Sequence, residues 1–284
     1  IGDEFLVNTN VTSHQYDPSV VAHGDGFVVT WWDQDGNDDS QGGSGYDIFA
    51  KTFSTTDAGG NAVTTPVVDA DEFLVNTYTS GSQYQPSVGS LSDGGFIVTW
   101  RDDKGSNHDG GDSIDVFGQR YDAAGGKLGD DFLVNADADA GSQYEPSITD
   151  LGDGKFVVTW RDSGGSSHDK NDNDTTKGSG YDVRGQVFTT ATVDIDGEAI
   201  PTPVALGGSF RINSYTSGHQ YEPSVTALAG ADAGFVVTWS DSSGYDGGSG
   251  ADIRGQRFDV SGMPSGDEFM VNSYTEGSQY MSSV

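Results

Sequence analysis

The chain has 284 residues, no cysteine, 42 glycines and 11% aromatic residues. Its 44 acidic and 13 basic side chains give a formal net charge of −31 at pH 7. This charge excludes nucleic acid and anionic membrane surfaces as partners, because phosphate binding needs a basic face. The lack of cysteine excludes disulfides and thiolate metal sites. No apolar run approaches the ~18 residues that a membrane-spanning helix needs, so we expect no membrane insertion.

One sequence pattern recurs along the whole chain. Each copy begins with Gln-Tyr and continues into Phe-(Val/Ile)-Val-Thr-Trp, and the Gln residues stand at positions 15, 83, 143, 220 and 279. We place the units at about 9–76, 77–135, 136–213 and 214–272, with a partial fifth at 273–284. We interpret 1–284 as a single repeat-built β domain. The partial fifth unit and the lack of a starting Met favour a fragment of a longer chain.

Each unit contains four short strand-like segments rich in β-branched and aromatic residues. The first begins at the Pro after Gln-Tyr, the second is the Phe-to-Trp run, the third begins at an Asp and the fourth ends at an Asn. In the first unit these are 18–22, 27–31, 47–53 and 72–76, and in the second 86–91, 96–100, 115–121 and 131–135. The third unit has 146–151, 156–160, 182–188 and 209–213, and the fourth has 223–228, 235–239, 252–258 and 268–272.

Glycine-containing turns connect these segments. Asp25-Gly26 and Asp153-Gly154 separate the first two strands as tight hairpin turns. Longer stretches, 54–71 and 189–208, precede the fourth strand in units one and three, and we expect loops there. No helical periodicity is visible.

Four antiparallel strands per unit, in units of about 60–79 residues, indicate an all-β fold and a β-propeller with one blade per unit. Tandem β-sandwiches, in which units combine in pairs, are the alternative. We expect the repeated Trp31, Trp100, Trp160 and Trp239 to pack between blades, and the Tyr of each Gln-Tyr pair to lie in the same core.

The strongest chemical signal is an acidic, Gly-rich loop after each repeated Trp. Every loop starts at Trp-x-Asp and ends at the Asp of the third strand. Carboxylate oxygens are the ligands that Ca²⁺ prefers, although Asp and Gly also suit solvated turns without a metal. The predicted calcium ligands are Asp33, Asp35, Asn37, Asp39, Asp47, Asp102, Asp109, Asp115, Asp162, Asp172, Asp174, Asp182, Asp241, Asp246 and Asp252.

The stretch 42–50 matches the calcium-binding nonapeptide Gly-Gly-x-Gly-x-Asp-x-U-x, and 247–255 matches it less fully. Together with the Phe-Val-Val-Thr-Trp core and the Gly-Gln pairs at 118, 185 and 255, the units resemble repeats of large secreted bacterial surface proteins of the RTX adhesin and hemolysin-type calcium-binding kind. The first unit departs from this pattern with Ala50-Lys51-Thr52. The resemblance covers nearly the whole chain and implies an extracellular, calcium-dependent surface role without a catalytic motif.

From these patterns we expect a calcium-stabilised propeller module of a large bacterial surface or secreted protein, acting in adhesion or display. Its partners would be a cell-surface glycan or neighbouring domains of the same protein. No sialidase Asp-box and no nucleophile elbow occurs, and we predict that the chain is not an enzyme. A glycan-binding propeller is the first alternative and a polysaccharide-acting enzyme the second. The candidate sugar-stacking residues are Trp32, Tyr46, Tyr181 and Tyr245.

Overall fold

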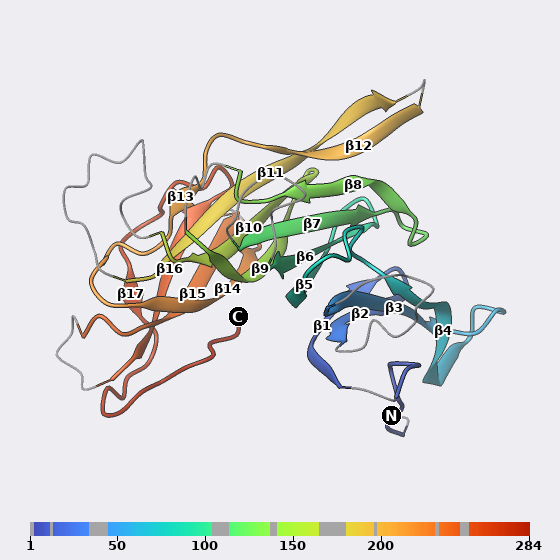
Figure 1. The fold of residues 1–284 in the computed structure, drawn as a ribbon, viewed down its shortest axis with the longest axis horizontal. Helices are drawn as coiled ribbons and strands as arrows, with labels where there is room; N and C mark the ends of the chain where they lie inside the picture. The colour runs from blue at the N-terminus through green and yellow to red at the C-terminus, as the bar shows by residue number, and fades with distance from the viewer. Residues whose placement is uncertain are drawn as a thin grey trace. The chain divides into compact units, whose positions relative to one another are not determined.

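The computed structural model describes residues 3–11, 14–33, 45–103, 114–136, 141–164, 180–195, 198–230, 233–244 and 250–284. These residues form β-strands joined by turns, and no helix occurs among them (Figure 1). The all-β class predicted from the sequence is therefore confirmed. Within the same residues, no helix is long and apolar enough to cross a membrane.

The first two repeat units form two four-stranded sheets, in which the strands are hydrogen-bonded in chain order. Sheet 1 consists of β1 (Gln15–His23), β2 (Gly26–Asp33), β3 (Asp47–Thr56) and β4 (Ala62–Leu74). Sheet 2 consists of β5 (Gln83–Ser90), β6 (Phe96–Asp102), β7 (Asp115–Tyr121) and β8 (Lys127–Leu133).

The third and fourth units repeat this order. Sheet 3 consists of β9 (Gln143–Gly152), β10 (Lys155–Asp162), β11 (Asp182–Ile195) and β12 (Glu198–Ala205), and the short β13 (Phe210–Arg211) also pairs with β11. Sheet 4 consists of β14 (Gln220–Leu228), β15 (Gly234–Asp241), β16 (Asp252–Asp259) and β17 (Phe269–Met270). Sheets 1, 2 and 4 thus have four strands each, as expected, whereas sheet 3 has five, because β12 is present in addition to β13 at the expected place of the fourth strand.

The hairpin turn predicted at Asp153-Gly154 is present, whereas the turn predicted at Asp25-Gly26 is centred one residue earlier, at Gly24 and Asp25, because Gly26 already pairs with His23. Asp153 and Gly154 join β9 to β10 with φ values of 52° and 71°. Two consecutive positive φ angles are typical of a type I′ turn, whose twist matches that of the flanking strands.

Two expectations about strand boundaries were wrong. Each first strand begins at the Gln, three residues before the Pro, and contains a bulge, as between Tyr16 and Ser19 in β1 and between Tyr221 and Ser224 in β14. Proline is tolerated there because these are edge strands with an irregular register. In addition, the stretches 54–71 and 189–208 are largely strand, since β3, β4, β11 and β12 extend into them. Alternating Val and Thr residues favour strands there.

The four repeated tryptophans are buried, as predicted. Trp31 is 3% exposed, Trp100 is 1% exposed, and Trp160 and Trp239 are fully buried. In sheet 4, Trp239 packs with Phe235 and Phe258, and Phe210, which follows β12, contacts both rings. The second strand of each unit therefore contributes mainly packing.

The prediction for the Gln-Tyr pair was wrong. Gln83, Gln143 and Gln220 are fully buried, whereas Tyr16 is 40% exposed and the equivalent Tyr residues are only half buried. Successive residues of a strand point to opposite sides, so burying the Gln turns its Tyr neighbour outward.

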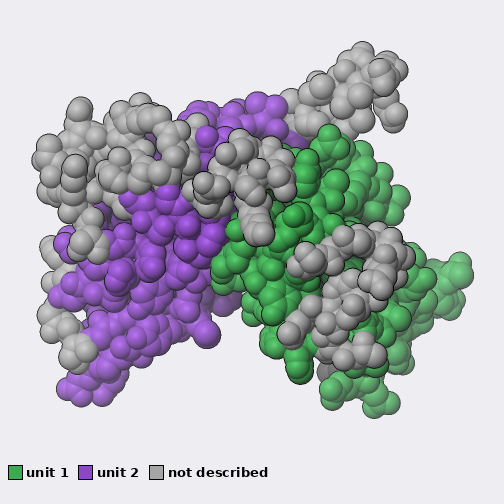
Figure 2. All heavy atoms as spheres, viewed as in Figure 1, with its two compact units in different colours: residues 1–112, 117–132, 191–202 green, residues 113–116, 133–190, 203–284 purple. Residues whose placement is uncertain are grey.

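The chain divides into two compact units (Figure 2). The first contains residues 1–112, 117–132 and 191–202, and the second contains 113–116, 133–190 and 203–284. The single-domain interpretation and the repeat boundaries remain predictions.

Candidate functional site

In sheets 1, 3 and 4, the two Asp residues that bound the acidic loop lie side by side at one end of the sheet. In sheet 3, Asp162 at the end of β10 is directly opposite Asp182 at the start of β11 and opposite Gln143 at the start of β9. Sheets 1 and 4 have the same row of Gln, Asp and Asp in register. The eight bounding Asp residues are between 1% and 5% exposed: Asp33, Asp47, Asp102, Asp115, Asp162, Asp182, Asp241 and Asp252.

An asparagine after the fourth strand holds these rows together. Asn213 Nδ2 donates to Asp182 Oδ1 (2.7 Å), to the Tyr215 carbonyl (2.7 Å) and to Gln220 Oε1 (3.4 Å). Its Oδ1 accepts the Val183 N–H at 2.7 Å. The same amide-to-Asp and amide-to-Gln bonds are made by Asn76, Asn135 and Asn272. Since Gln220 belongs to the next repeat unit, the asparagine ties one repeat to the next.

Burial of Asp182 and Asp47 is electrostatically costly. Burial raises the pKa of Asp182; the charge of Asp162 adds to the rise, while the Asn213 bond and the Arg211 charge oppose it. Burial likewise raises the pKa of Asp47, against the bond from Asn76. Desolvation disfavours an ionised carboxyl, so these two carboxylates depend on the amide donors of Asn213 and Asn76.

Arginine compensates this charge in two sheets. In sheet 4, Arg254 Nε is 2.8 Å from Asp241 Oδ2, and its Nη1 is 2.9 Å from Glu268 Oε1. In sheet 3, Arg184 Nε is 3.8 Å from Asp162 Oδ2. In sheets 1 and 2 a phenylalanine, Phe49 or Phe117, stands at the same repeat position.

The structure thus places eight of the fifteen predicted calcium ligands in buried hydrogen-bonded rows at the bases of the loops. Within the described part of the chain, no group of three or more His, Asp or Glu side chains is placed to hold a metal ion. The other predicted ligands lie outside the described residues: Asp35, Asn37, Asp39, Asp109, Asp172, Asp174 and Asp246.

An aromatic cluster surrounds Trp32 on the side of β2 opposite Trp31. The Trp32 ring stacks on Tyr16, with ring centroids 4.2 Å apart and an interplanar angle of 24°. Tyr46 and Tyr84 meet it edge-on at 5.0 Å and 5.2 Å. The predicted residues Trp32 and Tyr46 are therefore brought together, and Tyr16 and Tyr84 join them from the two Gln-Tyr pairs. We call these four residues the Trp32 cluster.

Polar groups border the Trp32 cluster. Trp32 Nε1 donates to Asp17 Oδ2 at 2.9 Å. The Arg101 guanidinium lies 5.0 Å from the centre of the Tyr84 ring and is 2.7 Å from Asp103 Oδ1. Aromatic faces together with a few oriented polar groups are the usual composition of a small-ligand site.

Asp17 belongs to a set of strained residues that the sequence did not reveal. The residue between Tyr and Pro in each repeat, or its equivalent in the fifth, has a positive φ of 48–59° without being glycine: Asp17, Gln85, Glu145, Glu222 and Met281. Such strain is concentrated at functional sites, and bulges often re-aim a side chain there. In the sequence, the only sign of this position is that a variable residue stands between Tyr and Pro in each of the four complete repeats.

The equivalent place in sheet 3 is built differently. Arg161 stands where sheet 1 has Trp32, and its guanidinium lies 4.4 Å from the Tyr144 ring centre and 4.8 Å from that of Tyr181. Arg161 Nη1 is also 3.1 Å from Glu145 Oε1. The predicted stacking residue Tyr181 therefore packs against an arginine, and Tyr245 lies outside the described residues. The cluster around a tryptophan is specific to the first repeat.

No family model matches the chain, and no curated protein matches it. Among solved structures, a GH43 endo-arabinanase from Bacillus licheniformis is 16% identical with a TM-score of 0.44, covering 89% of this chain and 77% of that one. An exo-1,5-α-L-arabinanase from a bovine ruminal metagenomic library is 15% identical with a TM-score of 0.45, covering 92% and 79%. An α-L-arabinofuranosidase from Lactobacillus brevis is 9% identical with a TM-score of 0.46, covering 88% and 74%.

The solved structures named above are glycoside hydrolases. These matches contradict the prediction that the chain is not an enzyme, and we withdraw that prediction. With TM-scores below 0.5, the same matches assign neither a reaction nor a catalytic residue to this chain.

Proposed function

We propose that this protein is a carbohydrate-binding β-propeller that holds neutral glycans at the Trp32 cluster. The observation that carries the proposal is that the ring centroids of Tyr16, Tyr46 and Tyr84 lie 4.2–5.2 Å from that of Trp32, beside Asp17 and Arg101. Aromatic faces pack against the apolar faces of sugar rings, and the polar groups can bond hydroxyls. The binding-module interpretation was the first alternative from the sequence.

The propeller arrangement is part of this proposal. Four sheets of the same strand order follow one another in the chain, as blades would, and asparagine bonds join consecutive repeats. Tandem β-sandwiches would instead pair the sheets face to face.

The negative charge of the chain favours neutral glycans over anionic ones as ligands. At a net charge of −31, anionic polysaccharides would be repelled by the protein's own field. We therefore expect neutral polysaccharides to bind better than uronic-acid polymers of similar length.

Replacing Trp32 with alanine should weaken glycan binding about 30-fold, the loss expected for a central aromatic contact worth about 2 kcal/mol. The measurement is isothermal titration with the neutral oligosaccharide that binds best in a polysaccharide panel. The same panel, assayed for released reducing ends, shows whether the bound glycan is also cleaved.

The matched control is Tyr274→Ala, which removes an aromatic side chain that is 64% exposed outside the cluster. This variant should bind like the wild type. Equal binding by the Trp32→Ala variant and the wild type would remove the cluster from the proposal.

We also propose that calcium stabilises the acidic loops and that the protein acts outside the cell, at a bacterial surface. What supports this is the pair of buried Asp residues at each loop base, together with the further carboxylates that the sequence places in each loop. Sheets 1 and 2 suit a cation best, because phenylalanine stands there in place of Arg184 and Arg254. The role in adhesion or display follows from the same proposal.

Chelation of calcium with EDTA should lower the Tm by about 5–10 °C. A ligand present at 100 times its Kd stabilises the folded state by about 2.7 kcal/mol. Each kcal/mol shifts the Tm of a chain of this size by about 2–4 °C. Differential scanning calorimetry with and without EDTA measures the shift, and restored calcium, but not magnesium, should reverse it. Superimposed melting curves would rule calcium out.

A further inference from the structure

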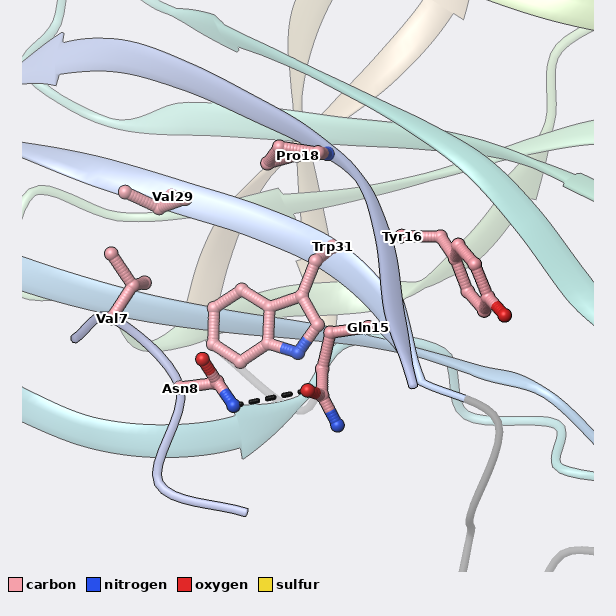
Figure 3. Close-up of a pocket in the computed structure, with 7 residues that line it drawn as sticks. All are labelled: Val7, Asn8, Gln15, Tyr16, Pro18, Val29 and Trp31. Carbon is pink, nitrogen blue, oxygen red and sulfur yellow. Dashed lines mark hydrogen bonds between the residues drawn. The ribbon is translucent and has the colours of Figure 1, made fainter. Parts of the chain in front are cut away.

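A cavity of about 270 Å³ opens beside sheet 1 and is lined by Asn8, Gln15, Trp31 and apolar neighbours (Figure 3). Figure 3 shows the Asn8 amide directed at Gln15, and Asn8 Nδ2 donates to Gln15 Oε1 at 3.1 Å. Asn8 ends the stretch Glu4-Phe5-Leu6-Val7-Asn8, which repeats the Glu-Phe-Met-Val-Asn of 268–272. This stretch therefore corresponds to the fourth strand of a repeat.

Residues 4–8 also pack as a fourth-strand segment does. Phe5 lies 6.4 Å from Phe27 and 5.4 Å from Phe53, ring centre to ring centre. Phe210 makes the same contacts with Phe235 and Phe258 in the second compact unit, at 6.5 Å and 5.7 Å. Both segments thus use one phenylalanine to cover the core of the sheet that follows.

The other four asparagines at this position each hold a third strand. Asn76 donates to Asp47 Oδ1 at 2.7 Å and accepts the N–H of Ile48 at 2.8 Å. The same two hydrogen bonds are made by Asn135, Asn213 and Asn272. Their partners are Asp115 and Val116, Asp182 and Val183, and Asp252 and Ile253, respectively. An aspartate followed by Val or Ile is thus the constant partner of this asparagine.

At Asn8 the side-chain bonds within the described residues go to the Asn10 carbonyl and to Gln15. Residues 3–8 belong to no sheet in the described structure. In the second compact unit, Val183 of a third strand packs with Ile212 and Trp239, whose equivalents Val7 and Trp31 line the cavity. The cavity therefore corresponds to the place of a third-strand side chain. Backbone without a sheet partner, such as residues 4–8 in the described structure, offers an edge to an added strand.

We infer that this edge is a docking site for an extended strand that carries Asp followed by Ile or Val. The Asp accepts from Asn8 Nδ2, the next residue donates its N–H to Asn8 Oδ1, and its side chain fills the cavity above Trp31. The occupant is the third strand of another repeat unit of this type, because the four third strands of this chain are already paired in their own sheets. This inference does not depend on carbohydrate binding.

Titration with a fluorescein-labelled peptide of residues 250–259, which contains Asp252 and Ile253, tests the inference by fluorescence polarisation. Saturable binding is expected, with at least a 10-fold loss for the Asp252→Ala peptide. The protein variant Asn8→Ala should show a similar loss, whereas Asn61→Ala, an exposed asparagine in the turn before β4, should bind like the wild type.

Lack of saturable binding at millimolar peptide, or equal binding of the two peptides, would overturn the inference. The peptide comparison uses unchanged protein, so it holds even if Asn8→Ala disturbs the N-terminal segment. Sedimentation analysis adds one outcome: a wild-type dimer that Asn8→Ala converts to monomer, without peptide binding, would overturn the inference and assign the edge to a second copy.

Discussion

Replacing Asn213 with leucine should lower the free energy of unfolding by about 3–5 kcal/mol, the usual cost of leaving a buried charge without its partner. Asn213 is 2% exposed and links Asp182, Val183 and Gln220. Leucine has a similar volume but offers no donor to the carboxylate and no acceptor to the Val183 N–H. Urea unfolding of the variant and the wild type gives the difference.

The equivalent change at Asn272 is the matched control. Asn272 makes the same bonds to Asp252 and Gln279 but is only half buried, so water can replace them. Asn272→Leu should therefore cost less than half as much. Equal costs at the two positions would mean that burial of the network is not the source of its strength.

The Asn213 variant should also respond differently to pH. The pKa of Asp182 is raised in the folded protein above its ordinary value of 3.8, so the folded state binds this proton more tightly and the ionised group lowers stability at neutral pH. Removing the Asn213 bond, which lowers this pKa, raises it further. The deficit of the variant should thus shrink as the pH falls from 7 towards about 4, and a deficit independent of pH would contradict this reasoning.

Replacing Trp160 with alanine should cost about 3–5 kcal/mol, as is typical when a large aromatic side chain is removed from a core. Trp160 is fully buried in β10, between β9 and β11 of sheet 3. The cavity left behind cannot collapse easily because strands hold both sides of β10. Urea unfolding measures the loss.

The control is Trp32→Ala, which removes the same side chain from the partly exposed Trp32 cluster. It should cost about 1 kcal/mol or less. A loss below about 1 kcal/mol for Trp160→Ala as well would show that the repeated tryptophans do not hold the sheets together.

The repeat made much of this fold predictable. Strands and turns followed from local patterns: β-branched runs such as Phe156 to Trp160, and the Asp153-Gly154 turn. The prediction of which side chains of the first strand face the core was wrong. The first strand has a bulge before Pro, with Gln facing inward and Tyr facing outward. A one-residue shift in register reverses the two faces and leaves no mark in the composition. The strands within 54–71 and 189–208 were missed because length variation was taken as loop.

The candidate site was only half predictable. Trp32 stood out because no other unit has a second Trp, and Tyr46 was named with it. Tyr16 joins them as the cross-strand partner of Trp32 in the first hairpin, a pairing that the notion of an inward-facing Tyr concealed. Tyr84 comes from the second repeat, so no single repeat encodes its contact with Trp32. The asparagine network was hidden for the same reason: Asp182, Asn213 and Gln220 lie in three separate segments.

Glycan binding at the Trp32 cluster is tested most directly by a crystal structure of the protein soaked with the neutral oligosaccharide that binds best. The expected result is a sugar ring packed against Tyr16 and Trp32, with hydroxyls bonded to Asp17 or Arg101. A glycan bound elsewhere, with the Trp32 cluster left unoccupied, would contradict it.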